Sequence, residues 1–174
     1  MKNVNHFERA NQMVENNSEM FGKFLTFLTE NQLFAIPISD VVQIVGIQEI
    51  TELPDSPHYV KGIIGLRGSI ILVIDIRLRL GKIEKQYDER TCIIVSMING
   101  KLIGFIVDEV DAVIYIEEEN ISGIPKVTDN SNNRYLTGIA KIDGKVVLLM
   151  DASKILSNDI ITNFEDQIEG GSLL

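Results

Sequence analysis

The feature that most constrains this 174-residue chain is a segment that occurs in it twice. The segment YVKGIIGLRGSIILVIDIRLRL (59–80) aligns without a gap on YLTGIAKIDGKVVLLMDASKIL (135–156), and upstream ENQLFAIPISDVVQIV (30–45) aligns on NGKLIGFIVDEVDAVI (99–114). Self-similarity of this kind indicates one structural unit used twice. We therefore predict two copies of one small unit over residues 23–156, with a boundary near residues 82–90 and the last strands able to exchange between the units.

The unit itself reads as β-structure, because short β-branched runs alternate with Gly, Pro, Asn and Asp. FLTFLTENQLFAIPI predicts two strands around the turn Glu30-Asn31-Gln32, and CIIVSMINGKLIGFIV predicts two more around Asn99-Gly100, a strong hairpin signal. GSIILVID and GKVVLLMD are almost continuously apolar, which predicts strands buried on both faces. Short strands at this spacing are typical of barrels and sandwiches.

Helices are expected to be short. Ser56-Pro57 is a helix-start signal before PHYVKGII, and Ser39 is a possible N-cap for DVVQIV. The tail over 157–174 places apolar residues at helical spacing and ends in two glycines, which predicts an amphipathic C-terminal helix. Residues 1–22 are polar and weakly periodic, so we expect a frayed N-terminal arm. The apolar residues of the tail are Ile160, Ile161, Phe164 and Ile168.

The charge and the distribution of apolar residues limit the kinds of partner and the compartment that we expect. The formal net charge of −9 argues against binding to nucleic-acid phosphates, which requires clustered Lys and Arg. The N-terminus has no apolar leader, and no apolar stretch is long enough to span a bilayer. The single cysteine, Cys92, precludes an internal disulfide and suits a reducing compartment. We expect a cytoplasmic protein with no direct membrane insertion, whose partner is a protein or a small molecule.

The repeat also sorts individual residues, since what recurs is expected to be scaffold and what does not is a candidate for function. Asp75 recurs as Asp151, and Gly62 recurs as Gly138. A carboxylate at the end of the strand would accept hydrogen bonds from the N–H groups of the following turn. Arg67 does not recur, because Asp143 takes its place. An arginine on a turn between glycines is either a docking residue or simply solvated, and the pattern alone leaves both interpretations open.

Other chemistry is weakly supported. Neither His6 nor His58 has a cysteine or another histidine at a spacing that would bind zinc. The sequence also contains no nucleophile elbow and no phosphate-binding loop. Asp108, Glu109 and Asp111 could hold a divalent cation, although they lack the spacing of a calcium loop and read more simply as a solvated strand face. We predict no catalytic residues, no cofactor and no metal site, and keep a cation-binding β-protein as the alternative from another functional class.

The chain resembles the CheW family of chemotaxis coupling proteins from about Phe24 to Leu156. The resemblance is carried by FAIPISDVVQIV, ITELPDSPHYVKGIIGLRGSIILVIDIRLRLG, GKLIGFIVDEVDAV and YLTGIAKIDGKVVLLMDASKIL. It implies two SH3-like five-stranded β-barrels that share a hydrophobic core. It also implies a non-enzymatic adaptor that joins the cytoplasmic signalling tips of chemoreceptors to the regulatory domain of the histidine kinase CheA. A scaffold for a non-flagellar sensory system, or a detached kinase regulatory domain, would look similar.

The resemblance also implies which residues make contacts. Family members use the groove between the barrels and the face of the first barrel, which carries over here to Leu66, Arg67 and Gly68, with Val41 and Gln43 on the expected short helix. Two departures from the family pattern are Gly65, where Asn is usual, and Leu72, where Pro is usual. Gly65 removes a side chain able to bond the backbone, so we expect it to loosen the turn.

Overall fold

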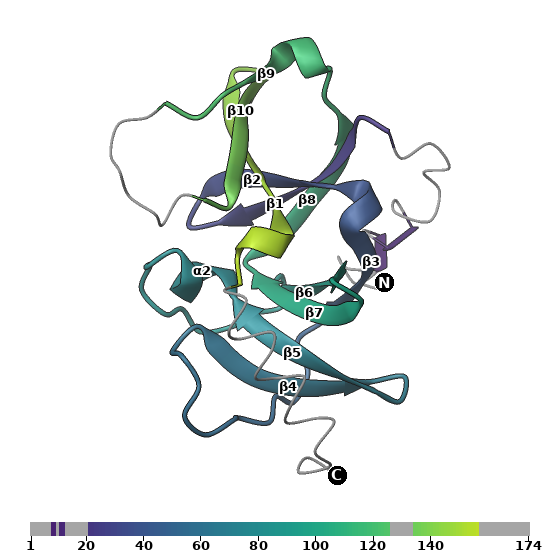
Figure 1. The fold of residues 1–174 in the computed structure, drawn as a ribbon, viewed down its shortest axis with the longest axis vertical. Helices are drawn as coiled ribbons and strands as arrows, with labels where there is room; N and C mark the ends of the chain where they lie inside the picture. Colours follow the sequence, from purple (N-terminus) through teal and green to yellow (C-terminus); the bar gives the residue numbers. More distant parts are fainter. Residues whose placement is uncertain (1–7, 10, 13–20, 126–133, 157–174) are drawn as a thin grey trace.

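The computed structural model describes residues 8–9, 11–12, 21–125 and 134–156, and these form two antiparallel-rich β-sheets (Figure 1). The strands are β1 (Lys23–Thr29), β2 (Gln32–Pro37), β3 (Val41–Gly46), β4 (Val60–Leu66), β5 (Ser69–Asp75), β6 (Cys92–Ile98), β7 (Lys101–Val107), β8 (Glu109–Tyr115), β9 (Ile121–Ser122), β10 (Leu136–Ile142) and β11 (Lys145–Met150). Short helical pieces are η1 (Ile38–Asp40), α2 (Ile76–Arg79), η2 (Glu118–Asn120) and η4 (Ala152–Lys154). The mostly-β prediction is confirmed.

The two sheets have the same strand order once repeat-equivalent strands are matched. Sheet A runs β8-β1-β2-β11-β10-β9 and sheet B runs β3-β6-β7-β5-β4. Equivalent strands are β1 and β6, β2 and β7, β3 and β8, β4 and β10, and β5 and β11, so β9 is the only addition to sheet A among the described strands. Apart from β9, each sheet takes two strands from one repeat and three from the other, and the repeats are therefore interleaved rather than placed side by side.

Two-residue turns fix the hairpin registers. Asn99 and Gly100 have φ of 49° and 80°, and they connect β6 to β7. Glu30 and Asn31 have φ of 51° and 62°, and they connect β1 to β2. Such left-handed pairs match the twist of the flanking strands, which is why local sequence predicts these turns well. Both predicted hairpins are confirmed.

Gly62 and Gly138 lie at register shifts in equivalent hairpins and let a third backbone segment approach. A Cβ on Gly62, whose φ is +142°, would stand 2.0 Å from the carbonyl oxygen of Thr51. A Cβ on Gly138 would stand 2.7 Å from Ile121 Cγ2 and 3.2 Å from the oxygen of Ser122. In both repeats the glycine is thus required because another chain segment pairs with, or packs directly on, that strand.

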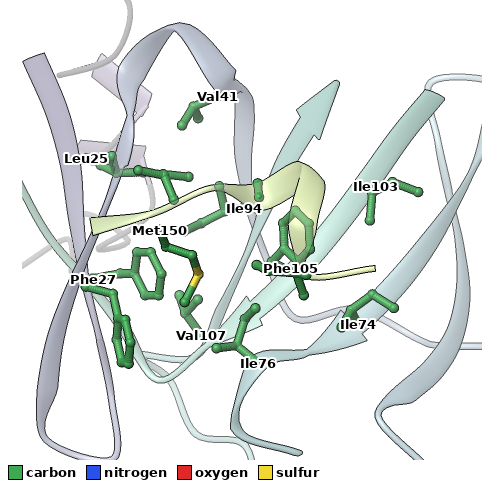
Figure 2. Close-up of a cluster of buried hydrophobic side chains, with 14 of the residues drawn as sticks. Leu25, Phe27, Val41, Ile74, Ile76, Ile94, Ile103, Phe105, Val107 and Met150 are labelled. Carbon is green, nitrogen blue, oxygen red and sulfur yellow. The ribbon is translucent and has the colours of Figure 1, made fainter. Parts of the chain in front are cut away.

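The largest hydrophobic core lies between the sheets and draws on both repeats (Figure 2). Phe27 and Phe34 stack with their ring centroids 5.7 Å apart on the sheet A side, while Ile74 and Phe105 come from sheet B. A second cluster, which includes Val73 and Ile93, fills the other face of sheet B. Because β5 is covered on both faces, its continuous apolar run is explained.

Two of the expected helices are strands. Residues 60–66 pair with β5, and the Ser56 hydroxyl donates to the Leu53 carbonyl at 2.9 Å instead of capping a helix. Ser39 lies inside η1, and residues 41–46 pair with β6, so Val41 and Gln43 are on a strand and the helix assignment is wrong. In both cases a β-branched, apolar segment gains more from pairing in a sheet than local cap signals can offer. The predicted C-terminal helix lies outside the described residues.

Arg79 lies where the two repeats meet. The Nε of Arg79 donates to the carbonyl oxygen of Ile155 at 2.7 Å, and Ile155 is the residue that aligns with Arg79 in the second repeat. The guanidinium carbon is 5.3 Å from the ring centroid of Tyr59 and 5.7 Å from that of Tyr135, which are also counterparts. A single cation therefore contacts equivalent aromatic rings of both repeats.

Candidate functional site

Strand direction brings the predicted contact residues to one end of sheet B. The start of β3 pairs with the end of β6, because Val41 lies opposite Ser96. The β6–β7 turn follows, and β5 runs parallel to β7, so the β4–β5 turn at Arg67 and Gly68 lies at this same end. Figure 1 shows the β4–β5 hairpin projecting from the body. We call this end the turn end of sheet B, comprising Val42, Gln43, Gly65, Leu66, Arg67, Gly68 and Met97.

Arg67 is the exposed cation of this end. Its φ is 50° and that of Gly68 is 81°, so the two residues form a left-handed two-residue turn that lifts the arginine away from the sheet. Its counterpart Asp143 has the same φ of 50° before Gly144. The backbone of the turn is thus common to both repeats, and only the side chain differs. Leu66 is half-buried against the second core cluster, and the space beside Gly65 is open.

The apolar surface at this end comes from residues that the sequence did not single out. Val41 is only 7% exposed and belongs to the core, whereas its neighbour Val42 is 51% exposed. Val42 is the extra residue of a β-bulge between Val41 and Gln43, and Gln43 is half-buried. Met97 is 50% exposed at the end of β6. The turn end therefore has two exposed apolar side chains, on β3 and β6, and an exposed guanidinium in the β4–β5 turn.

The equivalent bulge in sheet A has a different residue. There Asp111 lies between Val110 and Ala112 as the extra residue opposite β1, and its Oδ2 accepts a hydrogen bond from Thr26 Oγ1 at 2.9 Å. In sheet A the bulge is tied to the neighbouring strand, while in sheet B it presents Val42 to solvent. Comparing Val42 with Asp111 in the repeat alignment was the available sequence signal for this difference.

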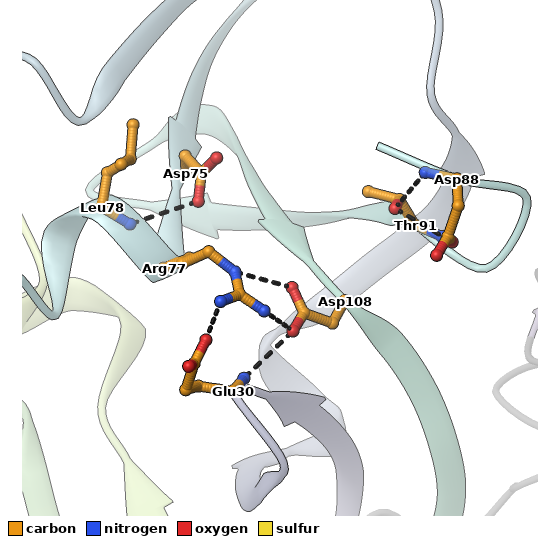
Figure 3. Close-up of polar contacts among 7 residues, drawn as sticks. All are labelled: Glu30, Asp75, Arg77, Leu78, Asp88, Thr91 and Asp108. Atoms are coloured by element: carbon orange, nitrogen blue, oxygen red, sulfur yellow. Dashed lines mark hydrogen bonds and ion pairs between the residues drawn. The ribbon is translucent and has the colours of Figure 1, made fainter. Parts of the chain in front are cut away.

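The opposite end of sheet B is held to sheet A by Arg77, which sequence reasoning missed (Figure 3). Arg77 is 8% exposed, forms ion pairs with Glu30 and Asp108, and its Nε donates to Asp108 Oδ1 at 3.3 Å. Asp108 also accepts from the backbone N–H of Glu30 at 3.0 Å. Three separate segments are joined by one buried cation, which is a structural arrangement.

The junction related to it by the repeat has no such tie. The positions equivalent to Arg77, Asp108 and Glu30 are Ser153, Ser39 and Asn99, none of which is charged. This junction adjoins the turn end of sheet B, since Asn99 belongs to the β6–β7 turn. Among the described residues, the ion pairs between the sheets therefore lie at the Arg77 junction, and the junction without them is at the end of sheet B that carries Arg67.

Asp75 lies at the end of β5, at the same end of sheet B as Arg77, and is 2% exposed. Its carboxylate accepts from the N–H of Leu78 at 3.3 Å (Figure 3). It also accepts from the hydroxyl of Tyr87 at 2.8 Å. Burial raises the pKa of Asp75, and the bonds from Tyr87 and Leu78 oppose that rise. Burial, and then the bond to Asp75, raise the pKa of Tyr87. Asp151 accepts from the N–H of Ser153 at 3.0 Å, so each aspartate is the N-cap of a short helical turn, Asp75 bonding the third residue after it and Asp151 the second.

The acidic residues considered for a cation have protein partners. Asp108 faces Arg77, Glu109 lies 3.9 Å from Arg90, and Asp111 is bonded to Thr26. Within the described ranges no group of three or more His, Cys, Asp or Glu is arranged to hold a metal ion. Over the same residues no helix is long and apolar enough to cross a membrane.

Comparison with known proteins gives the family. The model of the CheW-like domain matches residues 23–159. The chain belongs to the CheW family. It is 31% identical over 137 residues to the chemotaxis protein CheW of Klebsiella aerogenes, covering 79% of this chain and 82% of that one. It is 32% identical over 152 residues to the chemotaxis protein CheW of Helicobacter pylori, covering 86% and 90%.

Structural comparison agrees with CheW membership. The crystal structure of the scaffolding protein TtCheW from Thermoanaerobacter tengcongensis superposes with a TM-score of 0.71 at 35% identity, covering 77% of this chain and 91% of that one. The family expected from the sequence is therefore confirmed, and with it the class of the protein, a chemotaxis adaptor or scaffold.

Proposed function

We propose that this CheW-family chain couples the cytoplasmic tips of chemoreceptors to the regulatory domain of the histidine kinase CheA, as a non-enzymatic adaptor. One observation carries the proposal: three chain segments end at the turn end of sheet B, where Val42 on β3, Met97 on β6 and Arg67 in the β4–β5 turn are all exposed. Exposed apolar side chains and a cation at the same end of one sheet suit an amphipathic helical partner, which would dock its apolar face and fix its register by charge.

The asymmetry between the two junctions supports placing the receptor at this end. Arg77 joins the sheets at the far junction, while Ser39, Asn99 and Ser153 leave the near junction uncharged. A partner that inserts beside an untied junction has no ion pair to break. The kinase would then bind at the remaining edges, and weak single contacts would be reinforced when many copies assemble beneath receptors.

The test compares receptor binding by Arg67→Ala, Arg67→Glu and the matched control Lys145→Ala. Lys145 is exposed beside the equivalent turn of sheet A, so its removal takes away the same positive charge next to that turn and away from the turn end of sheet B. We expect Arg67→Ala to weaken binding of a chemoreceptor cytoplasmic fragment about three- to tenfold, mainly through slower association and less so at high salt, because rim charges act in this way. Lys145→Ala should bind as wild type.

Melting temperature and kinase capture complete the test. The melting temperature should hardly change in either Arg67 variant, since Arg67 is exposed on a turn. Wild-type protein should recover a receptor fragment and the CheA regulatory domain together, and Arg67→Glu should recover the kinase domain without the receptor. Equal receptor binding by all four proteins would refute the placement of the site, and a large fall in melting temperature would make Arg67 a structural residue.

A further inference from the structure

The outer edge of β3 is bonded to a side chain from far upstream. The backbone N–H of Ile44 donates to Asn11 Oδ1 at 2.7 Å, and Asn11 Nδ2 donates to the carbonyl oxygen of Ile44. Both polar groups of one residue are thus bonded to one carboxamide. Since both groups are taken by Asn11, they point away from β6, the strand that pairs with β3 on its other side.

The Asn11 carboxamide has a carbonyl acceptor and an NH2 group with two N–H donors, so it can present one acceptor and one donor to Ile44 as a residue of a paired strand would. Its contact with Ile44 therefore reproduces the bonding of an added strand at one position. An edge strand leaves such groups open to pairing with another chain unless something covers or blunts them. Asn11 covers Ile44, which is the middle of the outer edge.

The other sheet edges are protected by different means. The equivalent edge strand of sheet A, β8, carries Glu109 and Asp111. The far edge of sheet B, β4, carries Lys61 and is bridged by Thr51. The sequence of β3, VVQIVG, contains no charged residue and no proline, and Val42 within it is 51% exposed. Of the long edge strands in the described part of the chain, β3 alone lacks a built-in charge.

We propose that the outer edge of β3 is a self-association surface, closed in the monomer by Asn11, at which a second copy of this chain pairs its own β3. A residue whose N–H and C=O both point outward can exchange both bonds with the same residue of another copy across a twofold axis, as in an antiparallel pair. Ile44 would lie at that axis, in the place that Asn11 occupies. The surface does not depend on the receptor-coupling role.

The test first removes the Asn11 side chain from the outer edge of β3 and then adds a charge to that edge at Val42. Asn11→Ala should raise the weight-average mass measured by light scattering from the 19.5 kDa monomer toward twice that value as concentration rises. Because each copy carries a net charge of −9, added salt should strengthen the association. Gln12→Ala, a change at the exposed neighbour, should remain monomeric. The double variant Asn11→Ala/Val42→Asp places at the bulge the residue that sheet A has there, and it should return to the monomer.

Amide hydrogen exchange locates the surface. In dilute Asn11→Ala, exchange at Ile44 should be about tenfold faster than in wild type, the equivalent of one lost hydrogen bond. It should slow again at concentrations where the dimer forms. An Asn11→Ala protein that stays monomeric at all concentrations overturns the proposal, as does a dimer that leaves Ile44 unprotected or that persists in the double variant.

Discussion

The contact between Asp75 and Tyr87 gives the sharpest stability prediction. Asp75 accepts bonds from the Leu78 N–H at 3.3 Å and from the Tyr87 hydroxyl at 2.8 Å, and it is 2% exposed. Asp75→Ala leaves both donors without this acceptor. A buried donor left unpaired costs about 1–3 kcal/mol. Leu78 is buried and Tyr87 is half-buried, so Tyr87 can turn to water and the cost at the tyrosine is smaller.

The expected losses follow from that difference. Asp75→Ala should lower the free energy of unfolding by about 2–3 kcal/mol, and Tyr87→Phe should lower it by about 1 kcal/mol. The double variant should lose about 1 kcal/mol less than the sum of the single variants, because the bond can be lost only once. The measurement is urea unfolding of the full chain at fixed pH for the four proteins. Additive losses, or a loss below 0.5 kcal/mol for Asp75→Ala, which is about the size of a neutral surface change, would refute the assignment.

The same site predicts a pH dependence with a definite sign. Burial raises the pKa of Asp75 above its ordinary 3.8, so the folded state holds this proton more tightly than the unfolded state does. Between 3.8 and the raised value the folded state binds more protons, and the contribution of Asp75 to stability therefore falls as pH rises through that window. In Asp75→Asn this falling component should be absent. An unchanged profile in that variant would contradict the reasoning.

Two further substitutions test the scaffold by urea unfolding. Gly62→Ala should lower the free energy of unfolding by about 2–5 kcal/mol, because it adds backbone strain and disrupts the two hydrogen bonds between Thr51 and Ile63. Gly65→Ala, on the same strand but with open space beside it, should change the free energy of unfolding by less than about 1 kcal/mol. Similar losses in both variants would contradict the steric explanation. Arg77→Ala should lower the free energy of unfolding by about 2–4 kcal/mol, because it leaves the carboxylates of Glu30 and Asp108 without their shared cation. Arg77→Lys should recover only part of this loss, since an ammonium group cannot reproduce the planar, two-sided hydrogen bonding of a guanidinium. A loss below about 1 kcal/mol for Arg77→Ala would show that the ion pairs contribute as little as surface ion pairs do.

The sequence predicted well whatever depends on neighbouring residues. The hairpin at Asn99-Gly100 follows from two residues that accept positive φ, and the buried character of β5 follows from its own apolar run. The helices predicted after Ser39 and Ser56 were wrong because the cap signals there are equally local, while the outcome was decided by pairing with β6 and β5. A capping pattern carries no information about the strand with which a segment pairs, whether that strand follows at once, as β5 does, or comes much later in the chain, as β6 does.

Comparing the repeats showed which residues recur, but it could not show which of them are buried. Arg67 and Arg77 both lack a counterpart of their own kind, since Asp143 and Ser153 stand in their places. Arg67 is exposed on a turn, whereas Arg77 is 8% exposed between two carboxylates. The bulge that exposes Val42 was likewise invisible, because it arises from the register between two strands and not from the residue itself.

Arg79 shows why two copies of a unit joined in this way must differ somewhere. Arg79 and Ile155 hold the same place in their repeats and yet touch each other, so the pseudo-twofold axis of the molecule passes between them. Two arginines there would bring like charges together and compete for the single space between Tyr59 and Tyr135. A version of this protein with identical halves would have to give up the cation. The unequal pair is therefore a geometric consequence of folding two like halves about one line.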